Sequence, residues 1–170
     1  MKKTISIAAL ILMCISLLAG ASAAGTRIEE VEYKGFGIVK LDFDRDVRWY
    51  PEARFSLTDA AGTAIEATVI GGDEDSAYLF ARDLPENVET NLVFTLGESG
   101  QELSFTAVTG TEYKFTKNGV KAVVDKDRCD YCGQVGHDDD FCPKAFAGVQ
   151  LPDDPALLAR MFDIDPLPMR

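Results

Sequence analysis

The sequence predicts a mainly β protein: an antiparallel β-sandwich, then a small cysteine-rich module, then a short C-terminal helix. Between residues 28 and 109, apolar and polar residues alternate in short runs that turn residues separate, as in half-buried strands. No convincing amphipathic helix interrupts these runs, which favours an antiparallel sandwich. Three of the four cysteines and the only histidine lie within residues 129–142.

Residues 1–23 are expected to form a secretory signal peptide. Lys2 and Lys3 precede an apolar run, and Ala21-Ser22-Ala23 fits the small-x-small rule for cleavage. The run is too short for a membrane-spanning helix, and we find no transmembrane segment later in the chain. We therefore expect cleavage near Ala23, loss of Cys14, and an exported protein that is secreted, periplasmic or on the cell surface.

The charge of the chain restricts its partners. The chain carries 28 acidic and 17 basic residues and a net charge of −11. Without the signal, which contains two lysines and no acidic residue, 147 residues with a net charge of −13 remain. This length suffices for one core-bearing domain and a small appendage. The negative field disfavours polyphosphates and anionic lipid surfaces as partners.

The sandwich is expected over residues 26–110. Val39, Leu41 and Phe43 alternate with charged residues, as in a strand with one buried face. Turns are expected at 59–62, 71–75 and 97–100. Further alternating apolar positions are Phe55, Leu57, Ile65, Ala67, Val69, Tyr78, Phe80, Leu92, Phe94, Leu96, Leu103, Phe105 and Ala107.

This region resembles a bacterial immunoglobulin-like domain. The resemblance rests on the run from Val39 to Val47, on the turn at 59–62, and on Leu84-Pro85-Glu86-Asn87 ahead of the strand from Asn91. It implies a cell-surface or adhesion-type spacer rather than an active site. The Cys…Trp…Cys arrangement of antibody domains is absent. Trp49-Tyr50-Pro51 is interpreted as a loop over one end of the core, with a binding hot spot as the alternative.

Residues 111–128 are expected to form a β-hairpin that connects the sandwich to the next module. Two alternating runs flank Asn118-Gly119, which is a strong hairpin signal. The hairpin is either the last ribbon of the sandwich or a stalk, and we expect it to extend from the sandwich. It is locally basic, with Lys114, Lys117, Lys121, Lys126 and Arg128.

Cys129, Cys132, His137 and Cys142 have the spacing C-x2-C-x4-H-x4-C. Thiolates and imidazole at such spacing are typical of a tetrahedral Zn²⁺ site, so we predict one structural zinc ion. Four protein ligands leave no coordination position for water, and we predict that the protein is not an enzyme. A disulfide plus one free thiol is the alternative, because oxidation competes with metal binding in exported proteins.

Residues 129–142 resemble a retroviral-type CCHC zinc knuckle, and we expect this module to span residues 129–143. The resemblance implies zinc ligation by the three cysteines and His137, with Gly133 and Gly136 as turn formers. The nucleic-acid role of that family transfers poorly, because Asp130 replaces the usual aromatic residue and Asp138–Asp140 replaces basic residues. Single-stranded nucleic-acid binding remains an alternative. A thiol–disulfide redox protein based on C-x-x-C is a lesser one, since the expected βαβ context is missing.

Residues 144–170 are expected to form a tail with one short helix. Asp154 as N-cap and Pro155 at the first helical position predict a helix through Phe162. Its apolar face, either folded onto the body or used for docking, would contain Leu157, Leu158, Met161 and Phe162. The sequence thus predicts an exported, non-catalytic zinc protein, an immunoglobulin-like scaffold with a knuckle for protein or surface interaction. The partner and the oligomeric state do not follow from the sequence.

Overall fold

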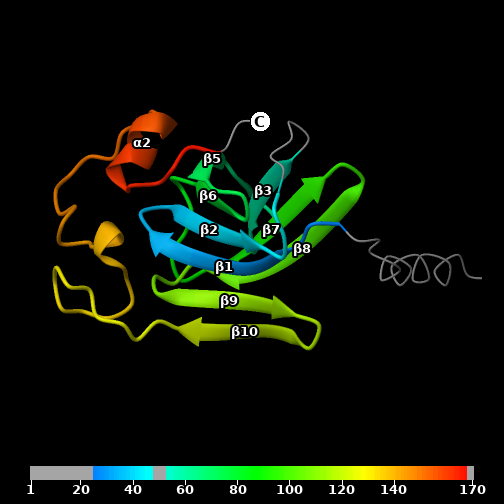
Figure 1. Ribbon diagram of the computed structural model, residues 1–170, viewed down its shortest axis with the longest axis horizontal. Helices are drawn as coiled ribbons and strands as arrows, with labels where there is room; N and C mark the ends of the chain where they lie inside the picture. Colours follow the sequence, from blue (N-terminus) through cyan, green and yellow to red (C-terminus); the bar gives the residue numbers. More distant parts are fainter. Residues whose placement is uncertain (1–24, 48–52, 168–170) are drawn as a thin grey trace, which may run out of the picture.

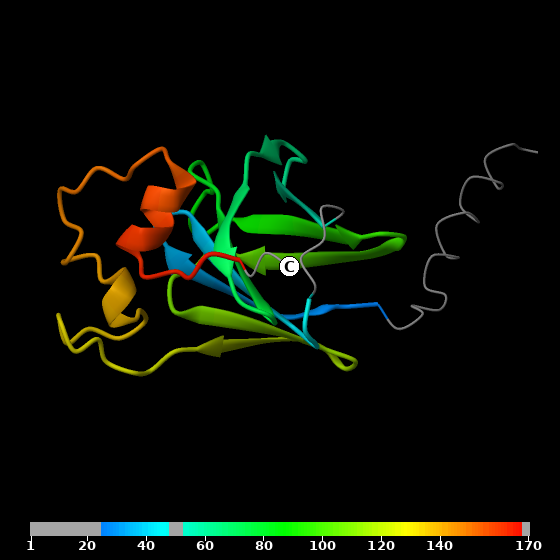
Figure 2. The same cartoon turned by 45° about the horizontal axis from the view of Figure 1, so that its top comes forward.

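The computed structural model describes residues 25–47 and 53–167. In them, two antiparallel β-sheets pack face to face, and a C-terminal segment covers part of the outer surface of the larger sheet (Figures 1 and 2). The protein is therefore mainly β, with one short helix near its C-terminus, as predicted. The expected signal peptide and Trp49-Tyr50-Pro51 lie outside the described residues.

The larger sheet has six strands in the order β10-β9-β1-β2-β6-β5, and the smaller has four in the order β4-β3-β7-β8. Every strand pair is antiparallel. The strands are β1 Ile28–Gly35, β2 Ile38–Phe43, β3 Arg54–Asp59, β4 Ala64–Ile65, β5 Thr68–Gly72, β6 Ser76–Phe80, β7 Glu89–Leu96, β8 Ser99–Thr106, β9 Thr111–Thr116 and β10 Gly119–Val124.

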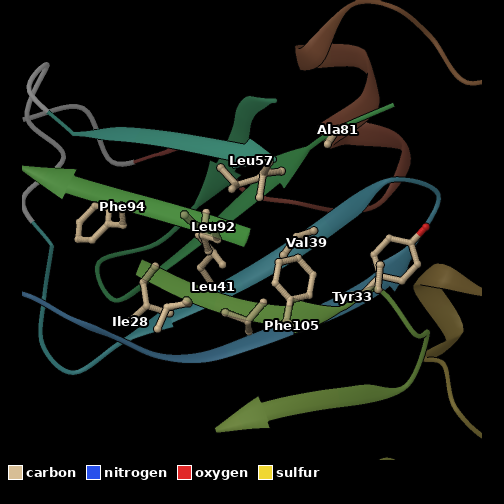
Figure 3. Close-up of a cluster of buried hydrophobic side chains, with 14 of the residues drawn as sticks. Ile28, Tyr33, Val39, Leu41, Leu57, Ala81, Leu92, Phe94 and Phe105 are labelled. Atoms are coloured by element: carbon tan, nitrogen blue, oxygen red, sulfur yellow. The ribbon is translucent and has the colours of Figure 1, made fainter. Parts of the chain in front are cut away.

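The main core lies between the two sheets, as the alternation predicts (Figure 3). Val39, Leu41 and Phe43 on β2 point into it, and the ring of Phe43 lies 5.3 Å from that of Phe94 on β7. Because residues i and i+2 of a strand share one face, β2, β6, β7 and β8 each contribute alternate side chains. Other buried members are Ile28, Val31, Tyr33, Leu57, Leu79, Leu92, Leu103 and Phe105.

The β9–β10 hairpin belongs to the sandwich. Strand β9 pairs with β1, with Tyr113 opposite Val31, so the hairpin forms the last two strands of the six-stranded sheet. The boundary expected after residue 110 therefore does not separate the hairpin from the sandwich. Its turn consists of Lys117 and Asn118, and Gly119 follows with φ +117°, a value that favours glycine.

The C-terminal segment begins with the 3-10 turn η1 (Asp139–Phe141) and ends after the helix α2 (Pro155–Met161). The Asp154 carboxylate accepts a hydrogen bond from the Ala156 N–H at 2.9 Å, which confirms the predicted N-cap. In the described part of the chain, no helix is both long and apolar enough to cross a membrane.

A second apolar cluster lies on the outer face of the six-stranded sheet, where α2 packs on β5. Its buried members are Ile38, Ile70, Phe141, Leu158, Ala159, Phe162 and Ile164, and we call it the outer cluster. Beyond α2, the Gly72 N–H donates a hydrogen bond to the Asp165 carbonyl at 2.8 Å. The helix thus folds onto the body, although Leu157, expected on its apolar face, is 51% exposed.

Candidate metal centre

The structure brings the four predicted ligands together. One sulfur or ring-nitrogen atom from each of Cys129, Cys132, His137 and Cys142 lies within 4.8 Å of the others. The Cys132 Sγ lies 3.2 Å from the His137 Nε2. In a tetrahedral zinc site, bonds of about 2.0–2.3 Å place ligand atoms roughly 3.5–3.8 Å apart. The cluster is therefore compatible with one bound metal ion after small side-chain adjustments.

A tight turn places the first two cysteines on one side of the site. The Gly133 N–H donates to the Cys129 carbonyl at 2.7 Å, and the Cys129 N–H donates to the Gln134 carbonyl at 2.9 Å. Gly133 has φ +74°, a conformation that residues with a Cβ rarely adopt. The Gln134 N–H lies 3.5 Å from the Cys132 Sγ, so the turn also presents a donor to a ligand sulfur.

The second half of the loop supplies His137 and Cys142. The 3-10 turn η1 lies between them, and the Cys142 N–H donates to the Asp139 carbonyl at 3.2 Å. The Asp139 carboxylate accepts a hydrogen bond from the Asp130 N–H at 2.6 Å. This bond connects the two halves of the loop.

Two of the sulfurs have strongly shifted acidity. Burial raises the pKa of Cys129 to about 12. Burial also acts to raise that of Cys142, but the N–H groups of Ala145 and Lys144, together with Cys129 and His137, lower its pKa to about 6. The Cys142 thiol is therefore the first of the two to lose its proton. A bound divalent cation would favour the thiolate form of every ligand cysteine.

The loop is attached to the sandwich at two points. At the first, the backbones of Gly110 and Gly136 approach so closely that a Cβ on Gly110 would overlap Gly136. At the second, the Lys34 ammonium on β1 lies 2.6 Å from the Asp138 carboxylate and 2.7 Å from that of Glu32. Burial opposes the charge of Lys34, but the two carboxylates outweigh it and raise its pKa. No motif or periodic pattern in the sequence marks Gly110 or Lys34.

The loop also connects directly to the outer cluster. Phe141, which precedes the ligand Cys142, stacks on Phe162 with ring centroids 5.1 Å apart. Phe146 contacts the same ring at 4.8 Å, and its N–H donates to the Cys142 carbonyl. The position of Cys142 is therefore fixed by the aromatic residues that hold the C-terminal segment on the sheet.

The solvent side of the site is acidic. A surface hollow of about 310 Å³ beside Cys129 and His137 is lined by Arg128 and by Asp125, Asp127, Asp130, Asp138, Asp139 and Asp140. The Arg128 guanidinium donates to the Gly133 carbonyl, so this cation is engaged within the loop. Such a surface repels phosphate groups. Tyr131 is 68% exposed and is the aromatic side chain of the loop that faces solvent.

No protein-family model, no curated protein and no solved structure matches this chain. The assignment of the site therefore depends on the residues and their geometry.

Proposed function

We propose that the chain is an exported, non-catalytic zinc protein, in which an immunoglobulin-like sandwich carries a CCHC zinc knuckle used for protein or surface interaction. The convergence of Cys129, Cys132, His137 and Cys142 within 4.8 Å carries this proposal. Three sulfur donors and one imidazole nitrogen match the preference of Zn²⁺ for soft and borderline ligands in tetrahedral geometry. The signal-like N-terminus supports export.

The burial of the ligands supports a structural role for the metal. Cys129 and Cys142 are buried, His137 is nearly so and Cys132 is half-buried, so most of the ligand set lies inside the protein. A loop of this size cannot bury a core of its own, so metal binding would provide much of its folding free energy. Four protein ligands also leave no coordination position for a reacting water.

Single-stranded nucleic-acid binding is the second candidate, and the exposed ring of Tyr131 is the observation that favours it. A stacked base contributes about 1–3 kcal/mol when such a ring is available. The six aspartates around the hollow oppose it. Zinc-dependent and salt-sensitive binding of single-stranded RNA or DNA, lost in Tyr131→Ala, would favour this candidate over a protein partner.

The decisive experiment is metal analysis of the protein isolated from its native compartment without reducing agent. We expect one zinc ion per chain, and an N-terminus at Ala24 if the signal is cleaved. Cobalt substitution should give the intense visible absorption of tetrahedral thiolate coordination. Cys142→Ser should lose the metal, whereas Asp127→Asn, a change at the rim of the hollow, should retain it. Protein without metal and with two of the sulfurs joined would overturn the proposal.

A further inference from the structure

The two edges of the six-stranded sheet differ. At one end, the β5 edge is partly covered, because the Gly72 N–H donates to the Asp165 carbonyl of the C-terminal segment. At the other end, β10 pairs with β9 on one side, and among the described residues no strand pairs with its other side. Figure 1 shows β10 as the outermost strand of the sheet. An unpaired edge of this kind can pair with a strand of another chain.

Strand β10 also exposes an apolar row. Val120 and Val124 are 58% and 60% exposed, and Ala122 between them is exposed as well. Val120 pairs with Phe115 and Ala122 pairs with Tyr113, and both of these aromatic residues pack against the main core. Residues directly opposite each other share one face of a sheet, so the row lies on the inner face.

The row is uncovered because the sheets differ in width. The smaller sheet ends at β8, and Phe105 of β8 contacts Tyr113 of β9. Strand β10 therefore extends beyond the last strand of the opposing sheet (Figure 2). An inner face without an opposing sheet, next to an unpaired edge, is suited to strand pairing with a partner.

We propose that β10 is a dimer interface, in which it pairs antiparallel with β10 of a second copy of this chain around a two-fold axis at Ala122. The two-fold axis makes the contact self-complementary and closed, so it forms a dimer rather than a filament. The six-stranded sheets of the two copies then join into one continuous sheet. This proposal does not depend on the bound metal.

The alternation of side chains selects the register. With Ala122 on the axis, Val120 lies opposite Val124 of the second copy, and Ala122 lies opposite its own counterpart. All three apolar residues of the inner face then meet apolar partners. A register centred on Lys121 would place two lysines opposite each other, and one centred on Val123 would place Val120 opposite Lys126. Like charges directly opposite destabilise a strand pair.

The charges at the two ends of β10 indicate a second copy rather than an unrelated strand. Lys117 lies in the turn of the hairpin, and the segment after β10, Asp125-Lys126-Asp127-Arg128, carries two acidic and two basic residues. The register centred on Ala122 brings Lys117 across from Asp127 of the second copy, twice by symmetry. The same chain thus supplies both complementary charges. Since one strand pair is a small interface, the dimer should be concentration-dependent.

Sedimentation velocity of the zinc-loaded mature chain, at concentrations up to roughly 500 µM, tests the proposal. We expect a monomer–dimer equilibrium. Val124→Lys should weaken association at least about tenfold. Val149→Lys is the matched control, because Val149 is also an exposed valine but lies in the C-terminal segment, and it should leave association unchanged. Circular dichroism melting checks that both variants fold.

A charge exchange tests the register. Lys117→Glu and Asp127→Lys should each weaken the dimer, and the double variant should restore it. Zinc content is measured for each protein, because Asp127 lies close to Cys129. A monomer over the whole concentration range would overturn the proposal. So would a dimer that Val124→Lys and both charge changes leave unaffected, because the interface would then lie elsewhere.

Discussion

The main core and the outer cluster stabilise the molecule in different ways. The main core lies between two sheets, and its buried residues come from six strands of both sheets, β1, β2, β3, β6, β7 and β8, and from the loops between them. The outer cluster lies on one sheet face, and five of its seven buried residues come from the C-terminal segment. That segment reaches the sheet through the Cys/His loop, next to the ligand Cys142. We therefore expect the sandwich to fold without metal, and the C-terminal segment to depend on the proposed metal.

The largest expected effect is the loss of stability when a buried side chain is truncated, which we compare for the main core and the outer cluster. Leu92→Ala in the main core should lower the free energy of unfolding of the whole protein by about 2–5 kcal/mol. Phe162→Ala should cost about 3–5 kcal/mol but mainly release the C-terminal segment, since its ring contacts Phe36, Phe141 and Phe146. Urea unfolding with hydrogen exchange read out by region measures both. Equal loss of protection in β7 for the two variants would contradict the distinction.

The next effect concerns the approach of the loop to the sandwich. Gly110 and Gly62 both have a positive φ, of +73° and +82°, so we expect alanine to strain each position by about 1–2 kcal/mol. A Cβ at Gly62 meets nothing within 4 Å, whereas one at Gly110 overlaps Gly136. Gly110→Ala should therefore destabilise the protein clearly more than Gly62→Ala and should also weaken zinc binding. Thermal melts and competition with a chelator test this. Equal effects would show that the two backbones do not approach closely.

A smaller effect is expected at the ion pairs of β1. The Lys34 side chain is 11% exposed and bridges Glu32 and Asp138. Lys34→Met leaves two carboxylates without their cation and should cost about 1–3 kcal/mol, with faster zinc loss. Lys40→Met is the control, because among the described residues the ion pair of Lys40 is with Asp42 of its own strand β2, and this change should cost about 0–1 kcal/mol. Zinc release that is equally fast in both variants would argue against a role for Lys34 in holding the loop.

The last effect is a pH dependence within the sandwich, which becomes visible only above about pH 10. Burial and the neighbouring Glu86 raise the pKa of Tyr33 to about 12. The folded state therefore favours the neutral phenol, whose contribution is complete below the ordinary tyrosine pKa of about 10 and is lost as the pH rises to about 12. The stability difference between the wild type and Tyr33→Phe should shrink over this range. The exposed Tyr131→Phe serves as control. A constant difference between the wild type and Tyr33→Phe would contradict the prediction.

Local patterns predicted much of the fold and the site. The alternation at Val39, Leu41 and Phe43 placed a strand correctly, and Asp154-Pro155 placed the start of α2. Ligand spacing alone brought Cys129, Cys132, His137 and Cys142 into one candidate site. These features depend on residues close in sequence. The period of a strand decides which side chains share a face, and the length of a loop decides which ligands can reach one ion.

Contacts between distant segments were not predictable. Gly110 against Gly136 and Lys34 with Asp138 join residues with no shared local pattern, and only the folded chain brings them together. The exposure of Leu157 was not predictable for the same reason. Helical spacing predicts which residues share one face of the helix, but it does not predict how many of them contact the sheet. The place of the β9–β10 hairpin in the sheet depended on its pairing with β1, which a local turn signal does not specify.

Hydrogen exchange of the native protein before and after removal of its metal by a chelator tests the dependence of the C-terminal segment on zinc most directly. We expect faster exchange from residue 125 to residue 165, including α2, and unchanged protection in the strands of the main core. Unchanged exchange in α2 after the metal is removed would contradict a stabilising role for the ion. Loss of protection in both sheets would contradict the independence of the sandwich.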